Sequence, residues 1–67
     1  MTWQNFIKKT MSDLDCGRRI AIHLRDEFAH HFGRKEAIQE LIKVSYTDNG
    51  KVTFKFKVND KIKQITI

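Results

Sequence analysis

Hydrophobic and polar residues alternate along the C-terminal part of the chain, from residue 42 to residue 67. Successive side chains of a strand point to opposite faces, so this alternation predicts strands with one buried and one solvent-facing side. We expect a three-stranded antiparallel meander with strands at about 42–47, 51–58 and 61–67. In the middle strand the buried side would hold Val52, Phe54, Phe56 and Val58, and the outer side Lys51, Thr53, Lys55 and Lys57.

Two turn signals indicate how these strands pair. A three-residue loop over Asp48-Asn49-Gly50, with Gly50 as a left-handed bulge residue, keeps the apolar side chains of the first hairpin on one face. A two-residue turn at Asn59-Asp60 closes the second hairpin and leaves Ile62 on the outer face. The expected pairs are Tyr46 with Val52, Val44 with Phe54, Ile42 with Phe56, Ile65 with Phe54 and Ile67 with Val52.

Apolar residues recur at helical spacing in the N-terminal part of the chain. Thr2 can cap a helix over about 2–11, in which Trp3 and Phe6 lie on the side expected to pack on the sheet. The alternative for Trp3 is an exposed ring that stacks on a nucleic-acid base.

A second helix is expected over about 13–32. Ser12-Asp13-Leu14-Asp15 has the spacing of a capping box at its start, and Gly33 is the expected left-handed stop. Ile22 falls among charged residues, where an exposed apolar side chain hints at a contact with another protein. The apolar stripe of this helix comprises Leu14, Cys16, Ile20, Ala21, Leu24, Phe28 and Phe32.

A short third helix over about 34–42 would turn Ala37, Ile38, Leu41 and Ile42 inward and lead directly into the first strand. The predicted fold class is therefore α+β, with two or three N-terminal helices packed on one face of a C-terminal meander in the strand order 1-2-3.

Composition limits the classes of protein to consider. The chain has 67 residues, which is enough for one small domain, and a single cysteine, which excludes an internal disulfide framework and points to a reducing compartment. Residues 1–9 lack the apolar run of a secretion signal, and no stretch approaches the roughly 20 apolar residues that span a bilayer. We expect a cytoplasmic protein that does not enter membranes.

The residue types that carry catalysis or bind metals do not form a recognisable set. His23, Glu27, His30 and His31 lie within one expected helix, but His31 falls in the apolar stripe and nothing elsewhere completes a metal site. Cys16 lies on the same stripe, where a thiol is buried and inert. We therefore expect no catalytic residue, metal site or cofactor, and a protein that is not an enzyme.

The segment Phe28–Gly33 resembles the helix-turn-helix, in which a small residue such as Ala29 stands four positions before a turn glycine. A helix followed by a basic hairpin also looks like the second half of a winged helix, with Asp48-Asn49-Gly50-Lys51 as the wing tip. The likeness covers about residues 20–58. Arg34 and Gln39 stand where the motif has apolar residues, and the usual strand between the first two helices is missing, so the chain is not assigned to that family.

Positive charge is concentrated in the C-terminal half. The formal net charge is +5, and residues 34–67 carry eight Lys or Arg against four acids. We predict that this half binds the phosphate backbone of DNA or RNA, with salt-sensitive and sequence-independent affinity. The alternative is a solvated face whose lysines only protect the sheet from aggregation. The candidate binding residues are Arg34, Lys35, Lys43, Lys51, Lys55 and Lys57.

A second functional hypothesis is a small accessory protein, such as a phage- or plasmid-type inhibitor or adaptor, that modulates a partner protein or a nucleoprotein complex. Its basis is the small size of the chain, outward-facing Ile22 and Ile62, and an edge strand open to strand addition. An acidic protein surface would suit the same lysines. The sequence does not distinguish DNA, RNA and protein, and it leaves the oligomeric state open.

Overall fold

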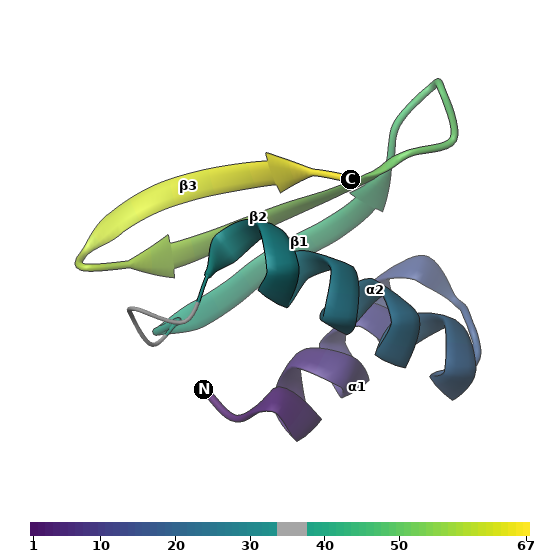
Figure 1. Ribbon diagram of the computed structural model, residues 1–67, viewed down its shortest axis with the longest axis horizontal. Helices are drawn as coiled ribbons and strands as arrows, with labels where there is room; N and C mark the ends of the chain where they lie inside the picture. Colours follow the sequence, from purple (N-terminus) through teal and green to yellow (C-terminus); the bar gives the residue numbers. More distant parts are fainter. Residues whose placement is uncertain (34–37) are drawn as a thin grey trace.

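The computed structural model describes residues 1–33 and 38–67. Two helices, α1 (Trp3–Leu14) and α2 (Arg18–Phe32), precede three strands, β1 (Glu40–Tyr46), β2 (Val52–Val58) and β3 (Lys61–Thr66). The strands form an antiparallel sheet in the order β1-β2-β3, and both helices pack on one side of it (Figure 1). The predicted α+β class and the meander order are confirmed.

The first hairpin forms with the expected loop. Gly50 has φ 78, its N–H donates to the Thr47 carbonyl at 3.0 Å, and the Thr47 N–H donates to the Lys51 carbonyl at 2.8 Å. Tyr46 pairs with Val52 and Val44 with Phe54, as predicted. The third expected pair, Ile42 with Phe56, is wrong. A β-bulge lies between Leu41 and Lys43, so Leu41 takes the place opposite Phe56.

The second hairpin has the predicted two-residue turn. Asn59 and Asp60 have φ 51 and 59, which is the backbone geometry of a type I′ turn. Phe54 pairs with Ile65, and Val52 and Ile67 exchange two backbone hydrogen bonds of 2.8 and 2.9 Å. Ile62 stays on the outer face and is 53% exposed. The register inferred for this hairpin is confirmed.

The helix boundary lies later than the capping-box pattern predicts. The Thr2 side chain caps α1 by accepting from the Asn5 N–H, but α1 continues through Ser12 and Asp13 to Leu14. Asp15 then adopts φ 52, a left-handed conformation that Asp tolerates, and ends the helix. Gly17 in turn caps α2, so the predicted helix over 13–32 is wrong before residue 18. Gly33 ends α2 as expected, but its φ of 77 and ψ of −175 are not the expected left-handed conformation.

The expected third helix, over about 34–42, is wrong where the structure can test it. Ile38 and Gln39 lie outside any helix, and residues 40–42 already belong to β1. The remainder of that segment, residues 34–37, lies outside the described residues. Apolar side chains at Ile38 and Leu41 fit a helical spacing, yet both are buried here without a helix, and the bulge after Leu41 places that residue opposite Phe56. The winged-helix likeness thus lacks its recognition helix from Ile38 onward.

Aromatic rings form the centre of the core between the helices and the sheet. Phe28 of α2 is fully buried and lies 4.8 Å from Phe6 and 5.0 Å from Phe54 between ring centroids. Phe56 lies 5.2 Å from Phe28 and 5.4 Å from Phe32. Burial of Phe54 and Phe56 beneath the helices confirms the central expectation from the strand alternation.

Three apolar residues differ from their expected burial. Trp3 touches the edge of Phe6 but is 41% exposed, and Ile20, expected in the buried stripe of α2, is 52% exposed. Ile22, expected outward, is partly buried. Ala21, expected in the same stripe as Ile20, is fully buried. Within residues 1–33 and 38–67, no helix is long and apolar enough to cross a membrane.

Candidate functional site

The side of the sheet that faces away from the helices carries the predicted binding lysines. Its residues alternate with the buried Val44, Phe54 and Phe56, so they point to the opposite face. We call this surface the outer face. It comprises Glu40, Lys43, Ser45, Thr53, Lys55, Lys57, Ile62, Gln64 and Thr66.

The register of the three strands arranges the outer face in three cross-strand rows. One row is uncharged, with the Thr53 and Thr66 hydroxyls 2.8 Å apart. The central row contains two lysines. The third ends on the exposed Ile62. In strand order the rows are Ser45–Thr53–Thr66, Lys43–Lys55–Gln64 and Glu40–Lys57–Ile62.

Lys43 and Lys55 pair directly across β1 and β2. Like charges at directly opposite positions of an antiparallel pair repel each other and destabilise the sheet. The ion pairs among the described residues are Lys9 with Asp13 and Arg25 with Asp26, so neither lysine is neutralised by a described carboxylate. This pair creates a local positive field at the centre of the outer face.

The remaining candidate residues lie around this pair or outside the described structure. Lys57 follows Lys55 by two residues on the same face of β2, with Glu40 as its cross-strand partner. Lys51 is exposed at the end of the first hairpin loop. Arg34 and Lys35 lie outside the described residues, so their predicted contacts remain predictions.

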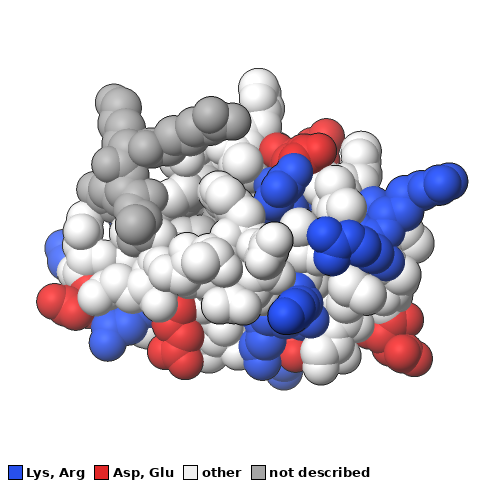
Figure 2. Space-filling view, turned by 90° about the horizontal axis from the view of Figure 1, so that it is seen from below, with Lys and Arg blue, Asp and Glu red and all other residues white. Residues whose placement is uncertain are grey.

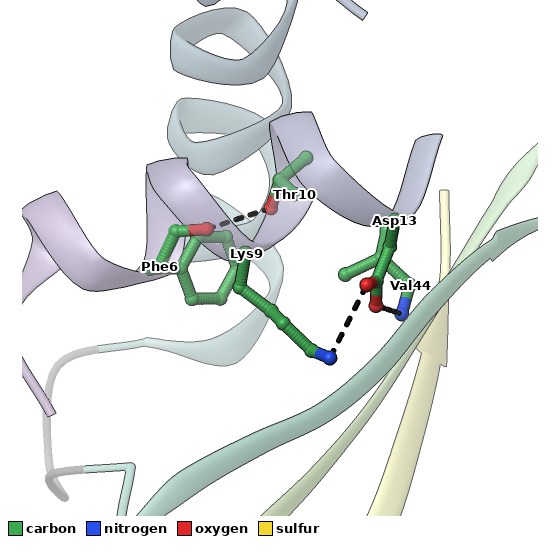
Figure 3. Close-up of polar contacts among 5 residues, drawn as sticks. All are labelled: Phe6, Lys9, Thr10, Asp13 and Val44. Carbon is green, nitrogen blue, oxygen red and sulfur yellow. Dashed lines mark hydrogen bonds and ion pairs between the residues drawn. The ribbon is translucent and has the colours of Figure 1, made fainter. Parts of the chain in front are cut away.

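The side of the molecule on which α1 lies has a different charge pattern. Figure 2 shows acidic and basic residues side by side around an uncharged centre. In Figure 3, Asp13 reaches from α1 to β1: one oxygen accepts from the Val44 backbone N–H at 2.8 Å, and the other lies 3.2 Å from the Lys9 ammonium. One outward N–H on the edge of β1, that of Val44, is therefore capped by a side chain of the same chain.

The other edge of the sheet is β3. The hydrogen bonds between β2 and β3 determine which of its backbone N–H and C=O groups point away from the sheet. Because Val52 and Ile67 exchange both hydrogen bonds, alternate residues of β3 point their N–H and C=O groups away from β2. These residues are Ile62, Gln64 and Thr66. The hydrogen bonds found among the described residues give these outward groups no partner. Sequence reasoning suggested an open edge but not which strand provides it.

The histidines and the cysteine do not assemble into a site. His23, His30 and His31 are exposed, so the placement of His31 in the apolar stripe is wrong. Cys16 lies in the connection before α2, not on that helix, and is partly buried against the core. Among the residues with described positions, no three His, Cys, Asp or Glu side chains are placed to hold a metal ion.

Comparison of the chain with protein-family models, with curated proteins and with solved structures found no match.

Proposed function

We propose that this protein binds the phosphate backbone of nucleic acid through the outer face, without sequence preference. The observation that carries the proposal is the direct pairing of Lys43 with Lys55. In the free protein the two ammonium groups repel each other, which destabilises the sheet. A bound polyanion would place negatively charged phosphates close to both ammonium groups and so offset this repulsion.

The chemistry of the surrounding residues supports backbone contacts. Lysine is a compact positive charge on a long stem, and it binds phosphates without reading base edges. Ser45, Thr53 and Thr66 add hydroxyls beside the lysine row, and hydroxyls also donate to phosphate oxygens. The described outer face carries no aromatic side chain, so stacking on unpaired bases does not contribute there.

Affinity measured against salt tests the proposal. We expect the logarithm of the association constant for a duplex DNA oligonucleotide to fall with log salt with a slope of about −3, for three to four neutralised phosphates. Replacing Lys43→Gln together with Lys55→Gln should reduce the steepness of the slope by about 2. The matched control is Arg18→Gln with Arg19→Gln, which removes the same charge from exposed positions at the start of α2.

The control variant should keep most of the salt dependence of DNA affinity that the unmodified protein shows. If both double variants lose affinity equally, the attraction comes from net charge alone and the outer face is not the site. If unmodified protein fails to bind duplex DNA, single-stranded DNA or RNA even at low salt, the proposed function is wrong.

A second candidate function is that of an accessory protein which binds a partner protein. The observation that favours it is the open edge of β3, at Ile62, Gln64 and Thr66, whereas Asp13 already occupies the Val44 N–H on the β1 edge. The first function uses side chains of the outer face and the second uses backbone groups of the β3 edge, so the two are tested separately.

A further inference from the structure

We propose that the open edge of β3 docks an extended acidic segment of a partner protein, which adds to the sheet as a fourth strand. This inference is independent of phosphate binding at the outer face. It rests on the asymmetry between the two sheet edges, on the outward backbone groups of β3, and on the charge distribution beside them.

The asymmetry of the edges is the first step. Asp13 caps the outward N–H of Val44, so a strand that paired with this residue of β1 would have to displace a 2.8 Å hydrogen bond. No described side chain caps β3, where Ile62, Gln64 and Thr66 all present outward N–H and C=O groups. Strand addition gains main-chain hydrogen bonds at each of these alternate residues. Among the described residues, the β3 edge can therefore receive a strand without losing an existing hydrogen bond, whereas the β1 edge would lose the one at Val44.

The side chains beside the edge select the composition of the added strand. On the inner side of β3, Lys61 and Lys63 are exposed, whereas Ile65 and Ile67 are partly buried against the core. An added strand would place alternate side chains next to these four residues. Acidic residues would complement the two lysines, and apolar residues would complement the two isoleucines. The complementary segment thus has two acidic residues near one end and two apolar residues near the other, and one residue separates the two members of each pair.

Antiparallel addition fixes the order of that pattern. Read from its N-terminus, the segment presents its apolar pair beside Ile67 and Ile65 first and its acidic pair beside Lys63 and Lys61 afterwards. The remaining residues of the segment would lie on the outer face, beside Ile62, Gln64 and Thr66. Polar or β-branched side chains suit these positions.

Charge argues against a second copy of this chain as the occupant. Two copies joined along β3 would bring Lys61 and Lys63 of both chains to one seam, and each chain carries a net charge of +5. Like charges near a strand seam oppose pairing, and lysines on edge strands commonly prevent such self-association. The lysines that block a second copy attract an acidic strand.

A synthetic peptide tests the inference. The probe is Val-Thr-Val-Thr-Glu-Thr-Glu-Thr with blocked termini, and its control is the same peptide N-methylated at alternate residues on the side that would face β3. We expect the probe to slow amide hydrogen exchange at Ile62, Gln64 and Thr66, measured by NMR on the full chain, and the N-methylated peptide to have no effect. Binding of both peptides alike, or protection elsewhere without protection of these amides, would overturn the proposal.

Charge reversal provides the second measurement. The double variant Lys61→Glu with Lys63→Glu should bind the original probe at least tenfold more weakly than the unmodified chain does. The same variant should bind a second probe in which Lys replaces both Glu residues. The equally charged variant Arg18→Glu with Arg19→Glu should bind the original probe as the unmodified chain does. A failure of the swapped pair to bind would contradict the proposed strand register. Dimerisation through β3 without peptide, seen by sedimentation together with concentration-dependent protection of the same amides, would assign the edge to a second copy instead.

Discussion

The Asp13 carboxylate of α1 accepts a hydrogen bond of 2.8 Å from the backbone N–H of Val44 in β1. This contact joins residues 31 positions apart in the chain, ties the C-terminal turn of α1 to the sheet, and supplies the partner that an edge-strand N–H would otherwise lack. It also distinguishes the β1 edge, where a side chain caps one outward N–H, from the β3 edge, where no described side chain does so.

The first prediction concerns this contact. Asp13→Ala should lower the free energy of unfolding by about 1–3 kcal/mol, because the N–H of the buried Val44 loses its acceptor. Asp13→Asn keeps a carbonyl acceptor and should cost less. Lys9→Ala removes only the partly exposed ion pair and should cost at most about 1 kcal/mol. Chemical denaturation of the three variants checks this order, and equal losses for Asp13→Ala and Lys9→Ala would contradict it.

The second prediction concerns the aromatic core. Phe28 is fully buried and has four phenylalanine rings within 5.5 Å between centroids. Phe28→Ala should cost about 3–5 kcal/mol, which is a large part of the stability of so small a domain. Phe28→Leu retains most of the apolar volume and should leave a cooperative unfolding transition. Thermal and urea unfolding measure both, and a loss below 1 kcal/mol for the alanine variant would show that the ring cluster is not central.

The third prediction uses two glycines with opposite backbone demands. Gly17 has φ −77 at the start of α2 and makes no side-chain cap, so Gly17→Ser should stabilise the fold by about 0.5–1 kcal/mol through capping and reduced chain entropy. Gly50 has φ 78 in the hairpin loop, so Gly50→Ala should destabilise it by about 1–2 kcal/mol, although a Cβ there meets no neighbour. Urea midpoints for the two variants should move in opposite directions, and shifts of the same sign would contradict the backbone assignment.

The sheet could be predicted almost completely because its signals are local and agree with one another. Phe54 and Phe56 alternate with lysines, and Gly50 and Asn59-Asp60 supply the residues that positive φ requires. The bulge at Leu41 and Ile42 could not be predicted, because the apolar run Ile38, Leu41 and Ile42 fits a helix as well as an irregular strand.

The helix boundary was harder to predict because two motifs compete for the same residues. Ser12 and Asp15 have capping-box spacing, yet Asp15 serves as the left-handed end of α1, and Gly17 starts the next helix without a side-chain cap. The role of Asp13 at the β1 edge required knowledge of how α1 lies beside the sheet. The facing of Lys43 and Lys55 was predictable from alternation, whereas the distinction between the two edges depends on tertiary packing.

The measurement that tests the central claim most directly compares stability with polyanion affinity in a single variant, Lys55→Glu. The new carboxylate would lie opposite Lys43 and replace a repulsive cross-strand pair with an attractive one. We therefore predict a free energy of unfolding about 0.5 kcal/mol higher, together with at least a tenfold loss of affinity for a duplex DNA oligonucleotide. Unchanged DNA affinity in a stabilised variant would contradict the account, because the lysine pair would then serve neither the fold nor binding.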